Sequence, residues 1–174
     1  MATLTRPSVK DIWRWLAEVP DPEIPALSVV DLGILRDVAW EGETLVVSVT
    51  PTYSGCPATS AINLDIERAL NGKGIEKLRL ERRLSPAWTS DWISAEGREK
   101  LKAYGIAPPV DGTAADGRLS KRIDRLTGRA NLTVACPRCG STRTEKVSQF
   151  GSTPCKASYR CSDCLEPFDY FKCI

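Results

Sequence analysis

Four cysteines in the last quarter of the chain restrict its fold more than any other feature. They form two Cys-x-x-Cys pairs, with 21 residues between the pairs: Cys136 with Cys139, and Cys161 with Cys164. Each short loop lets both thiolates reach one ion, and two such loops at strand ends supply the four ligands of a tetrahedral zinc site. The spacing therefore predicts a four-cysteine zinc ribbon domain over residues 135–174, with zinc held by these four thiolates.

The predicted ribbon is a small β domain, because strand-forming runs stand at 142–150, 156–160 and 167–171. It has few large apolar side chains, so metal binding would supply part of its folding free energy. Two more cysteines, Cys155 and Cys173, flank the second and third of these strands. We interpret them as a pair that handles metal or electrons: a dithiol, a disulfide or two ligands of a second metal site. Two chemically inert thiols are the alternative.

The absence of histidine excludes several classes of enzyme from a chain of 174 residues. Without imidazole there is no Ser-His-Asp or Cys-His catalysis, no His-based zinc hydrolysis, and no di-iron site built from Glu-x-x-His pairs. The formal net charge of +2 gives no reason to expect a nucleic-acid partner. No apolar run approaches the roughly 18 residues of a membrane span, and the first residues lack a signal-peptide core. We therefore expect a cytoplasmic protein without a membrane partner, in which cysteines serve metal or redox chemistry.

The first part of the chain has the pattern of an α/β (α+β) domain. Its predicted elements, in the order α-β-β-α-β-α, are a helix capped by Ser8, strands at 34–40 and 44–50, a helix at 57–70, a strand at 75–84 and a helix from Ser94 to 104. This order predicts a small mixed sheet packed by helices over residues 1–107. Residues 108–134 are rich in proline, glycine and small polar residues, which is typical of a linker before the ribbon.

Cys56 lies where a predicted strand turns into a predicted helix. Proline is favoured at the first helical position, so Pro57 would open the helix and Cys56 would stand at or beside its N-cap. Backbone N–H groups and the positive end of the helix dipole favour a thiolate there. The arrangement suits metal binding or thiol chemistry, and a small buried cysteine in a turn is the alternative.

Several motifs together resemble the SufT-type iron–sulfur assembly domain family. They are Asp-Pro-Glu-Ile-Pro at 21–25 with the stretch 28–34, the turn at 50–58, and Pro-Ala-Trp-Thr at 86–89. The segments 147–157 and 168–173 extend the resemblance over residues 8–174 to the PaaD-like subfamily, in which this domain is followed by a cysteine ribbon.

The resemblance implies a set of functional residues and a role. The family's marked acidic residues and turn cysteine correspond to Asp21, Glu23 and Cys56, which would handle iron or an iron–sulfur cluster. PaaD-like proteins accompany the multicomponent oxygenase that epoxidises the ring of phenylacetyl-CoA, and they are not its catalytic part. The resemblance thus implies a maturation factor with bound zinc, a transient iron or cluster, and a client that is either the di-iron subunit or the iron–sulfur/flavin reductase.

One cysteine cannot hold a cluster alone, so the implied mechanism also predicts a homodimer or a complex with the client. Two alternatives to the maturation role follow from the same residues. A thiol-redox protein would use Cys155 and Cys173 as its working pair. A non-catalytic adaptor would use the ribbon only to dock the oxygenase components.

Overall fold

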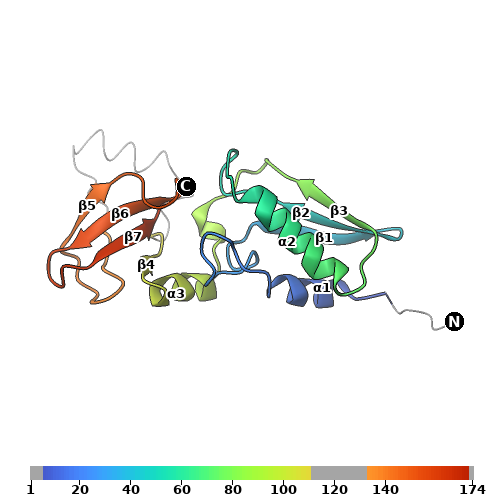
Figure 1. Ribbon diagram of the computed structural model, residues 1–174, viewed down its shortest axis with the longest axis horizontal. Coiled ribbons are helices and arrows are strands. Elements are labelled where there is room, and N and C mark those ends of the chain that lie inside the picture. Colours follow the sequence, from blue (N-terminus) through green and yellow to red (C-terminus); the bar gives the residue numbers. More distant parts are fainter. Residues whose placement is uncertain (1–5, 111–132, 173–174) are drawn as a thin grey trace. The chain divides into compact units, whose positions relative to one another are not determined.

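The computed structural model describes residues 6–110 and 133–172, which belong to two compact units, Met1–Trp88 and Thr89–Ile174 (Figure 1). The predicted class is confirmed: a unit of helices around a small mixed sheet is followed by a β ribbon. None of the described helices is both long and apolar enough to cross a membrane.

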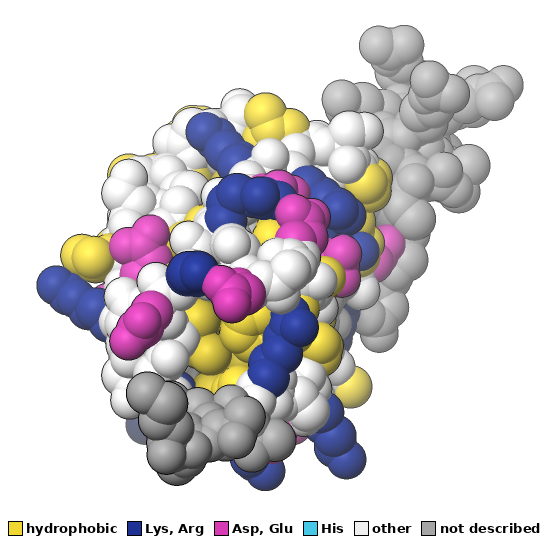
Figure 2. Space-filling view, turned by 90° about the vertical axis from the view of Figure 1, so that its right-hand side faces the viewer, with side chains coloured by type: hydrophobic (Ala, Val, Ile, Leu, Met, Phe, Trp, Pro, Cys, Tyr) yellow, Lys and Arg dark blue, Asp and Glu magenta, His cyan; other side chains and the backbone are white. Residues whose placement is uncertain are grey.

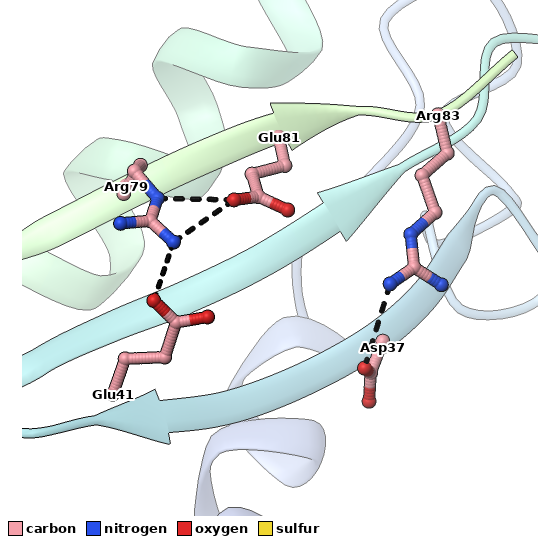
Figure 3. Close-up of polar contacts among 5 residues, drawn as sticks. All are labelled: Asp37, Glu41, Arg79, Glu81 and Arg83. Carbon is pink, nitrogen blue, oxygen red and sulfur yellow. Dashed lines mark hydrogen bonds and ion pairs between the residues drawn. The ribbon is translucent and has the colours of Figure 1, made fainter.

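The first unit is built on the mixed sheet expected from the sequence. Its elements are α1 (Val9–Leu16), β1 (Leu35–Glu41), β2 (Thr44–Val49), α2 (Thr59–Asn71) and β3 (Leu78–Arg82). In the sheet order β1-β2-β3, β2 pairs antiparallel with β1 and parallel with β3, so α2 is the crossover between two parallel strands. Helices α1 and α2 lie on one side of this sheet (Figures 1 and 3).

Capping and apolar spacing explain both helices. The Ser8 hydroxyl accepts from the Asp11 N–H at 3.1 Å, which satisfies one of the unpaired donors at the start of α1. Helix α2 buries Ile62, Ile66 and Leu70, which recur at the helical period. It begins two residues later than predicted, because the chain after Cys56 first makes a turn in which the Thr59 N–H donates to the Cys56 carbonyl at 3.3 Å.

Charged side chains form ion pairs on the face of the sheet opposite the helices. Arg79 of β3 reaches across β2 to Glu41 of β1 at 2.6 Å and also pairs with Glu81 at 2.9 Å (Figure 3). Arg83 and Asp37 form a second, longer bridge of 3.9 Å across the same face. These pairs lie over a central strand in which every residue after Thr44 is buried.

The second unit carries the predicted ribbon strands and begins before them. Its elements are the 3-10 turn η1 (Ser90–Trp92), α3 (Ala95–Ala103), β4 (Ile106–Ala107), β5 (Thr144–Ser148), β6 (Lys156–Cys161) and β7 (Pro167–Phe171). The sheet order is β4-β7-β6-β5, and β4 joins it by parallel pairing with β7. The sequence predicted the last three strands but not β4. The division at residue 107 stays a prediction, and within the described residues α3 and β4 group with the ribbon.

Candidate functional site

The four cysteines predicted to bind zinc come together in the second unit. Their Sγ atoms all lie within 4.8 Å of one another, with 3.8 Å between Cys136 and Cys164 and 3.6 Å between Cys139 and Cys161. A tetrahedral zinc ion with Zn–S bonds of about 2.3 Å places its sulfurs about 3.8 Å apart. The spacing of the thiols therefore fits zinc, which when bound would hold both loops together.

The two Cys-x-x-Cys loops share one backbone geometry. In each, the N–H of the first cysteine donates to the carbonyl five residues later at 2.9 Å: Cys136 to Ser141, and Cys161 to Glu166. The residue after the second cysteine has a left-handed backbone in both loops, Gly140 with φ 74° and Leu165 with φ 61°. Glycine adopts this conformation without strain and leucine does not.

Side chains cross between the two loops. Arg138 of the first loop pairs with Glu166 after the second at 3.0 Å. In the opposite sense, Asp163 of the second loop accepts a hydrogen bond from the Ser141 hydroxyl and forms an ion pair with Arg143, both after the first loop. This reciprocal pattern was not predicted from the sequence, because only the folded hairpin brings the two loops face to face.

Hydrogen bonds within the cluster shift the pKa values of two of the thiols in opposite directions. The Ser141 backbone N–H lowers the pKa of Cys139, but hydrogen bonding to the Cys164 thiol, partial desolvation and hydrogen bonding to the Cys161 and Cys136 thiols together outweigh it and raise that pKa to about 12. The Cys164 backbone N–H lowers the pKa of Cys161, in opposition to burial. Four thiolates in contact require a compensating cation, so zinc binding would release protons here.

A second candidate site surrounds Cys56 in the first unit. Cys56 and Asp21 line one small pocket of about 20 Å³, which is enough for a water-sized or ion-sized group. The other lining residues come from the loop before β1, the end of β2, the turn and α2: Leu32, Ile34, Val49, Pro51, Thr52, Thr59 and Ile62. An iron–sulfur cluster is larger than this space and would have to bind at its mouth.

Asp21 is fixed in place by its own loop. The side chain is 6% exposed, and its Oδ1 accepts from the backbone N–H groups of Glu23 at 2.9 Å and Ile24 at 2.8 Å. These bonds form an Asx-type turn that the flanking prolines stiffen. Glu23 itself is exposed and does not line the Cys56 pocket. The structure thus brings Asp21 and Cys56 together and leaves Glu23 outside.

A hydrogen-bonded frame supports the pocket wall. Asp31 Oδ2 accepts from the Ser28 N–H and hydroxyl, both at 2.9 Å, while the Ser28 hydroxyl accepts from the Asp31 N–H at 3.0 Å. The following residue, Leu32, lines the pocket, and its carbonyl accepts from the Trp88 indole N–H at 2.9 Å. Trp88, from the Pro-Ala-Trp-Thr motif, is buried.

A polar hollow adjoins the Cys56 pocket. Thr59 lines both spaces, and the second one, about 50 Å³, lies between α2 and β3. Thr59 Oγ1 and Asn63 Oδ1 are buried in it without a hydrogen-bond partner among the described residues. Arg82, which also lines this hollow, donates to the Ser54 carbonyl and so ties the Cys56 turn to β3. The sequence signal that could have indicated Asn63 is its i, i+4 spacing from Thr59.

Cys155 lies in a tightly held loop of the ribbon. Its Sγ is 3.0 Å from the Thr153 hydroxyl. The next residue, Lys156, is buried and pairs with Asp169 at 3.4 Å, and the Ser152 hydroxyl donates to the same carboxylate at 3.1 Å. The predicted partner of Cys155, Cys173, lies outside the described residues, so their pairing stays a prediction.

A wide groove of the first unit is lined by none of the predicted site residues. It measures about 660 Å³ and lies beside Trp40 and Ile75, with a charged rim that includes Arg6, Lys73 and Lys77. Figure 2 shows this end of the unit, where hydrophobic side chains appear between basic and acidic ones. Lys77 pairs with Glu43, and the Arg6 guanidinium lies 4.0 Å from the Trp40 ring centroid. The third cation, Lys73, has its Nζ 5.7 Å from the Trp15 ring centroid, so neighbouring side chains contact all three.

Comparison with known proteins assigns both units. Residues 121–172 match the model of the PaaD zinc beta ribbon domain, and residues 10–77 match that of the iron–sulfur cluster assembly protein family. The chain is 46% identical over 174 residues to an Escherichia coli K12 protein whose name describes it as one subunit of a "Putative 1,2-phenylacetyl-CoA epoxidase", covering 100% of this chain and 98% of that protein. This chain belongs to the PaaD family. The resemblance inferred from its motifs is confirmed.

Two further relatives of this PaaD family member match a little over half of it. A "Fe-S protein maturation auxiliary factor" of Porphyromonas gingivalis is 34% identical over 94 residues, 53% of this chain and 89% of that protein. A conserved hypothetical protein of Thermotoga maritima with a solved structure is 31% identical and covers 55% of this chain and 95% of that one, with a TM-score of 0.48. The two family models together show that this chain joins an iron–sulfur assembly domain to a zinc ribbon.

Proposed function

We propose that this protein is a maturation factor that delivers iron or an iron–sulfur cluster to the multicomponent oxygenase acting on phenylacetyl-CoA. It would serve the enzyme as an accessory protein and would not catalyse the epoxidation. The observation that carries the proposal is the meeting of Asp21 and Cys56, far apart in the sequence, at one small pocket. The family membership and the relative named as an iron–sulfur maturation factor support the same role.

In this proposal Cys56 is the residue that bonds the cargo. Its thiol would lose a proton as sulfur bonds iron, and the neighbouring carboxylate of Asp21 would accept that proton or bind the same ion. Asp21 suits this task because backbone N–H groups hold its Oδ1 in position. Glu23, exposed beside it, would act only on cargo that protrudes from the pocket.

The size of the pocket favours transfer over storage. About 20 Å³ accommodates a single ion but not a cluster, so a cluster would remain open on one side. Its remaining ligands would come from the client or from a second copy of the chain, since Cys56 offers one thiolate. Because one side of the bound cluster stays exposed, ligands of the client can bond it there while Cys56 still holds it.

The ribbon would dock the client, either the di-iron subunit or the iron–sulfur/flavin reductase. Zinc bound by Cys136, Cys139, Cys161 and Cys164 would hold the two loops rigid for this contact. Cys155 and Cys173 would hold or relay metal, which stays a proposal because only Cys155 is described.

The test is the metal content of the client. The oxygenase components are produced in cells that contain the wild-type protein, Cys56→Ser or Asp21→Asn, and iron and labile sulfide are measured per purified component. We expect Cys56→Ser to lose most of the gain that the wild type gives. Asp21→Asn should lose part of it, because the amide keeps an acceptor for the two backbone N–H groups but removes the charge.

Matched variants separate the proposed roles. Glu23→Gln should cost less than Asp21→Asn, because the exposed side chain lies outside the pocket. Cys155→Ser distinguishes cargo handling in the ribbon from handling at Cys56. A Cys56→Ser protein that restores full iron and sulfide to both components would refute delivery through Cys56 and leave the adaptor role.

A further inference from the structure

Leu165 lies at a position of the zinc ribbon where the backbone has a left-handed conformation, with positive φ. It follows the second cysteine of its loop, as Gly140 does in the first loop, and its φ is 61°. It is the one residue other than glycine with positive φ among those described. At Gly140, with φ 74°, an added Cβ would meet nothing within 4 Å. The loop thus requires a left-handed backbone at the residue after its second cysteine, and it requires no particular side chain there.

A leucine at this place is unfavourable in two independent ways. Its branched side chain strains a left-handed backbone, which glycine or asparagine tolerates. Its apolar side chain is also 61% exposed, so little burial offsets the strain. Strain that the fold does not need points to a functional contact.

The surroundings of Leu165 resemble the centre of a binding patch. The Arg138–Glu166 and Arg143–Asp163 pairs bracket the two loops and neutralise one another. Four thiolates around a divalent ion leave a local charge of about −2. The patch therefore consists of one projecting apolar side chain, Leu165, surrounded by charged side chains and a net negative charge. The apolar side chain suits a pocket with an apolar floor, and the negative charge suits a pocket with a basic rim.

We propose that Leu165 is an apolar anchor with which the zinc ribbon docks a protein partner through such a pocket. Resting on the proposed function, we identify that partner as a component of the oxygenase. Leu165 would insert into the pocket, while the paired charges around it meet the basic rim. The anchor is distinct from the cysteines, which hold the loops in place.

The experiment compares zinc-loaded full-length wild type with Leu165→Asn for binding to each purified oxygenase component. Asparagine keeps the left-handed backbone and removes the apolar side chain. We expect the Kd for one component to rise about tenfold or more, the effect of losing one buried leucine. Zinc content should be unchanged, and the thermal midpoint unchanged or higher, because the strain is relieved.

Three controls make the result specific. Leu165→Met, which keeps an apolar side chain, should bind nearly as well as the wild type. Val147→Ser removes another apolar residue of the ribbon that is 65% exposed but has no positive φ, and it should leave the Kd unchanged. Raising the ionic strength should weaken wild-type binding, as charge complementarity requires.

Several outcomes would overturn the inference. They are an unchanged Kd for Leu165→Asn, a loss of zinc or thermal stability in that variant, or no binding of the wild type to any component. Wild-type self-association that Leu165→Asn abolishes would make the occupant a second copy and reject the oxygenase. The delivery role is tested separately, by the iron content of the client. A dependence of that iron content on Cys56 would therefore stand even if Leu165→Asn bound normally.

Discussion

Replacing Trp88 by phenylalanine tests whether this residue supports the Cys56 pocket. The indole is 3% exposed, and its N–H donates to the Leu32 carbonyl, 56 residues away in sequence, in a buried bond of 2.9 Å. Losing the donor from a buried carbonyl costs about 1–3 kcal/mol. The smaller ring buries roughly 50 Å² less, which adds about 1 kcal/mol. We expect Trp88→Phe to lower the free energy of unfolding by about 2–4 kcal/mol.

The assay is urea unfolding of the zinc-loaded full chain, followed by the fluorescence of the remaining tryptophans, which except for Trp92 lie in the first unit. Trp15→Phe is the matched control, because Trp15 is only half-buried on α1, and it should cost less than about 1 kcal/mol by the same estimate. Since Leu32 lines the pocket, alkylation of Cys56 should also become faster in Trp88→Phe. A loss below about 1 kcal/mol would refute the structural role of the hydrogen bond.

Three other predictions follow from particular contacts. Cys161→Ser, or removal of zinc by a chelator, should unfold the ribbon while the first unit keeps its tryptophan fluorescence, because the metal supplies folding free energy only to the ribbon. Gly151→Ala should lower the free energy of unfolding of the zinc-loaded protein by about 1–3 kcal/mol in thermal melts, since a Cβ would lie 2.7 Å from Asp169 Oδ1. A crystal structure should show ordered water bonded to Thr59 Oγ1 and Asn63 Oδ1, whose hollow has room for it.

Each of these has a clear contrary result. Retention of ribbon structure without zinc would mean that its apolar core suffices. An unaltered melting temperature for Gly151→Ala would mean that the loop relaxes around the new methyl group. A dry hollow would mean that the two polar atoms find protein partners in solution.

Local signals in the sequence predicted the helices and ribbon strands well. The cap at Ser94 and the glycine at 105 delimit α3, and β7 runs from Pro167 to Phe171 as predicted. The cysteine spacing predicted the set of four thiols because the ligand geometry of one ion dictates it. Such features depend on residues that are near in sequence, or on a motif with its own geometry.

Contacts distant in sequence could not be predicted in this way. Strand β4 has two residues, and only its pairing with β7 makes it a strand. The exposure of Glu23 next to a buried Asp21 depends on how one loop packs against α2 and β2. The start of α2 was misplaced because Pro57 opens a turn before the helix. Tertiary packing decided each of these cases.

The pairing of β4 with β7 has a practical consequence for anyone who divides this protein. A fragment that begins at residue 108 would contain all four zinc ligands but would leave the outer side of β7 without its neighbour. Exposed strand edges with aromatic residues, such as Phe168 and Tyr170 on β7, promote self-association. A fragment that begins at Thr89 retains β4 and should remain monomeric at concentrations at which the shorter one aggregates.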